Sequence, residues 1–243
     1  MRIKPLLLVI SALPAPAQTF AASPKETFYY NIEWRLITAG KAKLEWFSAP
    51  RDGAQINLRV ESVGMVSKLF KVEDDYIANL GAGMCAQSAL ITTHEGSRAR
   101  ETRITFDYAS HRADYLERDR VKNSVLLAKE TDIPPCVHDV GGGLLLLRTL
   151  NLEPGQSAQV PMSDGKKSAM VKVEAQQRED VKTPAGAFKT IRYEAYLFNN
   201  VLYRRPARLF IWLTDDQHKL PVQIRVRMQL TIGTITLQLE KHE

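Results

Sequence analysis

The chain has 243 residues, of which 44% are hydrophobic and 25% are charged. It therefore contains enough apolar material for a folded core and is not an intrinsically disordered chain. Its formal net charge is +6, from 33 Lys and Arg against 27 Asp and Glu. Such an excess favours anionic partners only where the charges cluster, and otherwise it is the charge of an ordinary solvated surface.

The start of the chain has the layout of a cleavable secretory signal. A short basic stretch precedes an apolar run over 6–13, which is too short for a transmembrane helix of roughly 20 residues. Small residues at Ala15 and Ala17 then provide a cleavage site. We expect a signal peptide over 1–17, with a second cleavage position near residue 22; an uncleaved anchor is the alternative. The mature chain contains no later apolar segment of membrane-spanning length, so we expect it in the periplasm or outside the cell.

The chain contains two cysteines, Cys85 and Cys136. An exported protein meets an oxidising compartment, where such a pair tends to form a disulfide bond. Two buried free thiols are the alternative. The sequence contains no Cys-x-x-Cys motif, so it does not indicate a redox-active dithiol.

The first half of the chain alternates between apolar and polar residues. From Thr27 the alternation predicts a long strand with one buried face, and Ala39-Gly40 predicts a hairpin turn after it. The segment 64–70 is expected to be a helical turn or a loop that packs Met65, Leu69 and Phe70. Further strands are expected over 56–60, 76–80, 89–93, 102–108 and 112–117.

The second half is also rich in strand patterns, and it follows the best helix candidate, 136–150. Gly141-Gly142-Gly143 oppose that helix at about 1 kcal/mol each, which leaves open a start after the glycines. Strands are expected over 166–174, 188–198, 208–214, 222–230 and 232–239. We predict a mainly-β fold of antiparallel curved sheets, a sandwich or an open barrel, with one principal helix. A single β-rich domain is expected over 25–243.

Several stretches together resemble a known family. They are 133–140 with 147–150, 152–157, 181–191, and 210–216 with 220–222. In combination they resemble the domain-of-unknown-function family thirty-one-zero-eight of exported bacterial proteins. The resemblance implies export and a β-rich fold, and it implies no reaction. The architecture is also similar to that of periplasmic lipoprotein carriers, whose curved sheet surrounds an apolar groove, although fold alone does not fix function.

Catalytic and metal-binding patterns are weak throughout the sequence. Gly141-Gly142-Gly143 could be an oxyanion loop, but the Gly-x-Ser-x-Gly nucleophile motif is absent. Cys136 and His138 could form a nucleophile and base, although a disulfide would occupy the cysteine. The histidine spacings do not indicate a metal site. We therefore expect no metal and no cofactor, and we favour a non-enzymatic protein over a hydrolase of envelope polymers.

Aromatic and basic side chains are the candidate ligand-binding residues. They are Trp34, Trp46, Tyr203, Arg204, Arg205, Arg208, Phe210, Trp212, Arg225 and Arg227. The arginines near the C-terminus are the best candidates for an anionic partner, and a solvated sheet face is the alternative. We expect a protein that holds an apolar or lipid-like ligand in a β-lined groove. A protein-interaction or assembly module of the cell envelope is the alternative, and an exported protein is not expected to bind nucleic acid.

Overall fold

The alternating segments of both halves of the chain form one antiparallel sheet of 14 strands. The computed structural model describes residues 25–35, 37–49, 53–228 and 233–243. The expected signal peptide over 1–17, with its second cleavage position near residue 22, lies outside the described residues. No helix in the described part of the chain has both the length and the hydrophobicity that crossing a membrane requires.

The order of the strands follows the chain in two meanders. The first comprises β1 (Lys25–Trp34), β2 (Ile37–Ala49), β3 (Gly53–Ser62), β4 (Val72–Leu80), β5 (Ala86–Glu95), β6 (Arg98–Asp107), β7 (Arg112–Asp119) and β8 (Ser124–Asp132). The second comprises β9 (Ser157–Ser163), β10 (Ser168–Thr183), β11 (Gly186–Ala195), β12 (Ala207–Thr214), β13 (Pro221–Met228) and β14 (Thr234–His242). The meanders join where β1 pairs with β14, so β8 and β9 are the two edges of the sheet.

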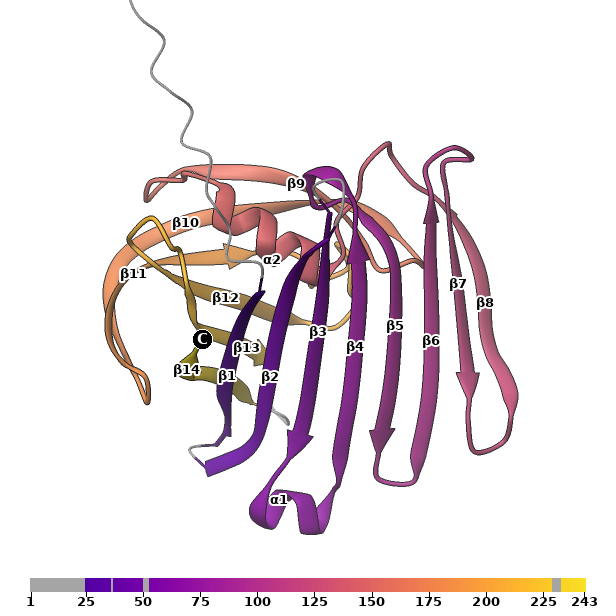
Figure 1. Ribbon diagram of the computed structural model, residues 1–243, viewed down its shortest axis with the longest axis horizontal. Coiled ribbons are helices and arrows are strands. Elements are labelled where there is room, and N and C mark those ends of the chain that lie inside the picture. Colours follow the sequence, from indigo (N-terminus) through magenta and orange to yellow (C-terminus); the bar gives the residue numbers. More distant parts are fainter. Residues whose placement is uncertain (1–24, 36, 50–52, 229–232) are drawn as a thin grey trace, which may run out of the picture.

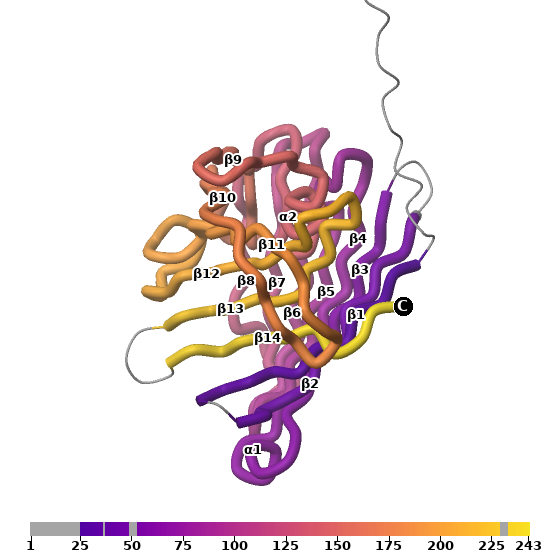
Figure 2. Tube along the Cα trace, turned by 90° about the vertical axis from the view of Figure 1, so that its left-hand side faces the viewer, coloured from indigo at the N-terminus to yellow at the C-terminus, as the bar shows by residue number. Residues whose placement is uncertain are grey.

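The sheet curls until its two edges approach each other, but it does not close (Figures 1 and 2). The side chains of Lys129 and Thr131 on β8 donate to the carbonyl of Lys166, in the β9–β10 turn, at 2.6 and 3.0 Å. We call this line of approach between β8 and the β9–β10 turn the seam. The predicted mainly-β fold, with a curved antiparallel sheet and one principal helix, is confirmed, and it takes the form of a single open sheet.

The principal helix, α2 (Val140–Thr149), connects the two meanders and joins two apolar clusters. Leu145 belongs to the cluster formed mainly by the first meander, and Leu147 belongs to the cluster formed mainly by the second. The helix begins after Asp139, whose Oδ1 accepts a hydrogen bond from the Gly142 amide at 2.7 Å. This cap satisfies one of the amides that a helix start leaves free.

The helix begins at Val140 and includes all three glycines, so the alternative of a helix start after the glycines is wrong. A Cβ atom on Gly142 would lie 2.8 Å from the Met84 carbonyl oxygen, and one on Gly141 would lie 2.7 Å from Ile56 Cδ1. The glycines therefore allow the helix to approach the first meander closely. This packing outweighs their low helix propensity.

We expect Gly142→Ala to lower the free energy of unfolding by about 1–3 kcal/mol, because the new methyl group meets rigid backbone. Gly143→Ala is the matched control on the same helix. Its Cβ would meet the end of the flexible Met162 side chain at 2.9 Å. Higher helix propensity should then leave stability unchanged or raised by up to about 1 kcal/mol. Urea unfolding measures both variants, and equal losses would contradict the packing argument.

The predicted hairpin is formed by β1 and β2, but its turn does not lie at Ala39-Gly40, because β2 runs through both residues. Gly40 has another role at this point of the sheet. A Cβ atom there would lie 2.6 Å from the Glu61 carbonyl oxygen on β3. A glycine that permits close approach of backbones gives the same sequence signal as a turn.

The short helix α1 (Gly64–Leu69) links β3 to β4 at the end of the molecule farthest from α2 (Figure 1). It corresponds to the helical turn expected over 64–70. However, the expected packing of its apolar side chains is wrong, because Met65, Leu69 and Phe70 are 73%, 81% and 52% exposed.

A disulfide bond joins Cys85 and Cys136, with their Cα atoms 5.2 Å apart. This confirms the disulfide over two free thiols. Cys85 follows the short 3-10 helix η1 (Ala82–Met84), and Cys136 precedes α2. The Ala86 amide donates to the Val137 carbonyl at 2.8 Å beside the bond. The bond therefore closes a loop that contains β5 to β8 and fixes that loop to the start of α2.

Candidate functional site

The aromatic and basic residues predicted to bind a ligand lie in three segments. Trp34 and Trp46 belong to β1 and β2, and Trp46 is 6% exposed beneath the guanidinium of Arg148. Five others lie on β12 and β13: Arg208, Phe210, Trp212, Arg225 and Arg227. Tyr203, Arg204 and Arg205 lie in the connection between β11 and β12.

The residues of β12 and β13 are largely partnered within the protein. Arg208 pairs with Glu194 at 2.7 Å and lies 4.8 Å from the ring centre of Phe210. Arg225 lies 5.0 Å from the ring centre of Trp212, whose Nε1 donates to Glu179 at 2.8 Å. These contacts hold the β10–β11 hairpin against β12 and β13, a role in packing rather than in an open groove.

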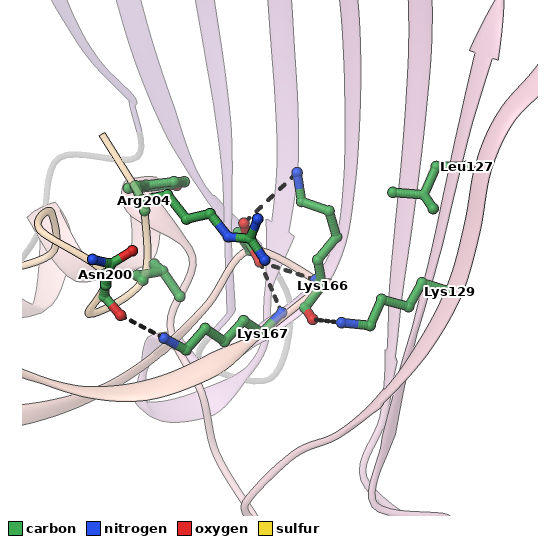
Figure 3. A pocket seen from close by; sticks show the side chains of 9 residues that line it. Leu127, Lys129, Lys166, Lys167, Asn200 and Arg204 are labelled. Atoms are coloured by element: carbon green, nitrogen blue, oxygen red, sulfur yellow. Dashed lines mark hydrogen bonds and ion pairs between the residues drawn. The ribbon is translucent and has the colours of Figure 1, made fainter. Parts of the chain in front are cut away.

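A cavity of about 560 Å³ lies at the seam, where three segments meet (Figure 3). Leu127 and Lys129 come from the edge strand β8. The β9–β10 turn and the β11–β12 connection supply the rest: Asp164, Lys166, Lys167, Asn200, Leu202, Tyr203 and Arg204. We call this cavity the seam pocket. Of the predicted ligand-binding residues, it brings together Tyr203 and Arg204.

The β9–β10 turn is fixed by its own carboxylate and glycine. Asp164 Oδ1 accepts hydrogen bonds from the amides of Lys166 and Lys167, both at 2.9 Å. Gly165 has a φ of +80°, and a Cβ there would lie 2.6 Å from Ile104 Cγ2 on β6. Both features require glycine. The turn is therefore pressed against the first meander, which places its two lysines beside β8.

The seam pocket carries an excess of positive charge. Four cationic side chains line it, against the one carboxylate of Asp164. Two of the lysines are held by carbonyl groups: Lys129 Nζ donates to Lys166 O at 2.6 Å and Lys167 Nζ to Asn200 O at 2.7 Å. Carbonyl groups orient an ammonium group without neutralising it. The pocket is therefore electrostatically suited to an anion.

Apolar side chains complete the wall of the seam pocket. Leu202 is 5% exposed and belongs to the apolar cluster of the second meander, and Tyr203 packs against the same cluster. Burial raises the pKa of the Tyr203 hydroxyl well above its ordinary value, and the carboxylates of Asp164 and Asp139 raise it further. The hydroxyl is therefore a protonated hydrogen-bond donor at neutral pH. Leu127, 38% exposed, lies on the β8 side.

A buried polar contact beside the pocket is structural. The Tyr76 hydroxyl donates to Asp139 Oδ2 at 2.5 Å, while Asp139 caps α2. His138 Nδ1 lies 2.8 Å from the Met84 carbonyl oxygen, which fixes the segment between Cys136 and α2. Within the described ranges, His, Cys, Asp and Glu side chains form no group of three that could hold a metal ion.

Sequence reasoning missed most of the seam pocket. Asp164-Gly165 is a turn signal in the sequence, but nothing in the sequence indicates that this turn meets Leu127 and Lys129. The available signal was the pair of lysines that follows the turn. This pair would indicate a binding site only if the turn were known to face another strand. The curvature of the whole sheet decides that contact.

Comparisons with known proteins bear on the family and on the fold of the chain. A family model described as Protein of unknown function (DUF3108) matches residues 29–240. The fold is similar to that of a β-barrel-like protein of the DUF1849 family from Brucella abortus, with 9% sequence identity, a TM-score of 0.56, and coverage of 90% of this chain and 97% of that chain. A DUF1089 family protein from Pseudomonas aeruginosa is 14% identical, with a TM-score of 0.34 and coverage of 87% of this chain and 95% of that chain. The search of curated proteins gave no match.

The likeness to the Brucella abortus protein concerns the fold, because the two sequences are only 9% identical. The family match rests on the sequence itself. It includes every stretch on which the resemblance to that family was based, and it extends from β1 to β14. The chain therefore belongs to the DUF3108 family of proteins of unknown function.

Proposed function

We propose that this is an exported, non-enzymatic protein that binds an anionic amphiphile, an apolar chain with a negatively charged head group, in the seam pocket. The observation that supports this most is the combination of four cations with an apolar wall in one cavity. A volume of about 560 Å³ lies within the range of small-molecule binding sites. The disulfide is consistent with an oxidising compartment and thus with export.

The two kinds of lining side chain define how such a ligand would lie. Lys167 and Arg204 are exposed, so they can meet a head group at the mouth of the pocket. No hydrogen bond or ion pair joins the Arg204 guanidinium to another side chain in the described part of the chain, so it is available to an anion. Leu202 and Tyr203 offer the apolar surface on which a hydrocarbon chain would pack.

The test is a titration with a fluorescent fatty acid and with its uncharged methyl ester. We expect the wild type to bind the acid more tightly than the ester. The double variant Lys167→Glu/Arg204→Glu should weaken binding of the acid about tenfold to hundredfold, because it removes charge-assisted hydrogen bonds. Affinity for the ester should change much less.

Arg205→Glu is the matched control, because Arg205 is an exposed neighbour that does not line the pocket. It should leave the affinity for the acid within about twofold of the wild type, because exposed charges that make no contact contribute little. If the wild type binds neither probe, or if Arg205→Glu weakens binding as much as the double variant, the proposed site is wrong.

A further inference from the structure

The short helix α1 and the start of β2 expose a group of large apolar side chains. Met65, Leu69 and Phe70 are more than half exposed, and Ile37, the first residue of β2, is 48% exposed. A helix of a folded protein normally buries an apolar face, but α1 has no buried residue. The fold of the protein therefore leaves these apolar side chains in contact with water.

The backbone on both sides of α1 is held by neighbouring strands and turns. Before the helix, the Val63 amide donates to the Ala39 carbonyl on β2 at 3.0 Å. After the helix, the Gly96 amide in the β5–β6 turn donates to the Lys71 carbonyl at 2.8 Å. A Cβ atom on Gly96 would lie 3.0 Å from the Phe70 ring, so the ring rests against that turn. The exposed side chains thus stand on a fixed platform, and a partner would not have to order a loop in order to bind them.

The connections at this end of the first meander are basic. Successive antiparallel hairpins turn at alternate ends, so the β1–β2, β3–β4, β5–β6 and β7–β8 connections lie at the α1 end (Figure 1). They contain no Asp or Glu, and their basic residues are Arg35, Lys68, Lys71, Arg120 and Lys122. The connections of the opposite end contain one arginine and two aspartates. Positive charge therefore gathers at the end that exposes the apolar side chains of α1.

Lys68 is the cation that lies closest to the apolar group in the sequence. It is exposed on α1 between Met65 and Leu69. In the part of the chain that the structure describes, no ion pair or hydrogen bond engages its ammonium group. Lys71 differs, because it pairs with Glu73 at 3.0 Å. The charge of Lys68 is therefore available to an anionic partner at the same place where the apolar side chains are exposed.

We propose that the α1 end of the first meander docks on the surface of an anionic lipid bilayer. Met65, Leu69 and Phe70 insert at the boundary between head groups and acyl chains, and Lys68 meets the anionic head groups. Lysine is depleted in protein–protein interfaces, whereas an anionic membrane surface attracts it. A lysine in the middle of the apolar group, with no carboxylate in the surrounding connections, therefore favours a bilayer over a protein partner.

Flotation of the mature, oxidised protein with lipid vesicles tests the proposal. The vesicles contain equal parts of phosphatidylcholine and phosphatidylglycerol, or phosphatidylcholine alone. We expect the wild type to bind the anionic vesicles at least about tenfold more strongly than the neutral ones, because several cations contribute. Met65→Ser should weaken binding to the anionic vesicles about tenfold, because an inserted apolar side chain is lost.

Met170→Ser is the matched control for Met65→Ser. Met170 is also exposed, but it lies on β10 in the second meander. The same substitution there should leave vesicle binding within about twofold of the wild type, as expected for a surface change away from the contact. Both residues are exposed, so neither substitution removes a side chain from the core of the protein.

A charge variant tests the role of Lys68. Lys68→Gln should weaken binding to the anionic vesicles about fivefold and leave binding to the neutral vesicles unchanged. Lys182→Gln, at an exposed lysine of β10, is its control and should change neither.

The docking surface shares no residue with the lining of the seam pocket, so the two proposals can fail independently. Lys167→Glu/Arg204→Glu should therefore keep most of the binding to anionic vesicles. A wild type that does not float with anionic vesicles would overturn the proposal. So would a Met65→Ser variant that floats as well as the wild type, or loss of vesicle binding in the seam-pocket variant alone.

Discussion

Replacing Arg148 by methionine should lower the free energy of unfolding by about 2–3 kcal/mol, because it removes several charge-assisted hydrogen bonds and leaves Glu26 without its cation in a half-buried ion pair. Arg148, in the last turn of α2, pairs with Glu26 on β1 at 2.8 Å. Its guanidinium also donates to the carbonyls of His218 and Lys219 at 2.9 and 3.0 Å, and it lies 4.3 Å from the ring centre of Trp46. One side chain thus ties α2 to β1, β2 and the β12–β13 turn.

Arg59→Met is the matched control for Arg148→Met. Arg59 makes an ion pair with Asp75 at 3.2 Å, but the two side chains are 52% and 46% exposed. Solvent screens such pairs, so the loss there should be at most about 1 kcal/mol. Urea unfolding of the two variants measures the difference. Similar losses at both positions would show that Arg148 is an ordinary surface cation and not the anchor of α2.

Loss of the Cys85–Cys136 bond should lower the free energy of unfolding by about 4 kcal/mol. The two cysteines are 51 residues apart in the sequence, and in the chain-entropy model the bond restricts the unfolded chain over that loop. The measurement compares urea unfolding of the oxidised wild type with that of Cys85→Ala/Cys136→Ala. The folded variant should retain the sheet, because hydrogen bonds such as that from Ala86 N to Val137 O hold the same segments together.

The single variants separate the bond from the packing of the two sulfur atoms. Cys85→Ala and Cys136→Ala should each cost nearly as much as the double variant, because either change removes the whole bond. The effects are then strongly non-additive, as expected for residues in direct contact. If each single variant lost about half of the total, packing and not the covalent link would be the source of the stability.

Strands with one buried face were predictable from the sequence. The alternation from Thr27 onward marks β1, where Phe28 and Tyr30 are 0% and 1% exposed. The disulfide was predictable from the cysteine count together with the signal-like start. For β1 a short stretch of sequence contains the whole physical cause, and for the disulfide the chain offers only one possible pair of cysteines.

The edge strand β8 was not predicted, and the reason is physical. An edge strand that is exposed on both faces has no buried side, so apolar and polar residues need not alternate along it. The stretch 124–128 accordingly shows no period of two. The seam pocket escaped prediction for another reason. Its lining comes from segments near residues 127, 166 and 203, which meet only because a sheet of 14 strands curls upon itself.

The same curvature connects the fold with the proposed function. An open sheet leaves a seam where edge strand and turn approach without pairing, and the cavity with its four cations lies there. The helix α2 contributes residues to both apolar clusters. The ligand site is proposed at the seam, where β8 approaches the β9–β10 turn.

Native mass spectrometry of the protein purified gently from its own envelope fraction tests the central claim most directly. Wild type and Lys167→Glu/Arg204→Glu would be prepared side by side, with Arg205→Glu as the control. We predict that the wild type and the control carry a reproducible additional mass that matches an anionic lipid, and that the double variant lacks it. Wild-type protein that carries no additional mass, or a double variant that keeps the same lipid, would contradict the assignment of the seam pocket as the binding site.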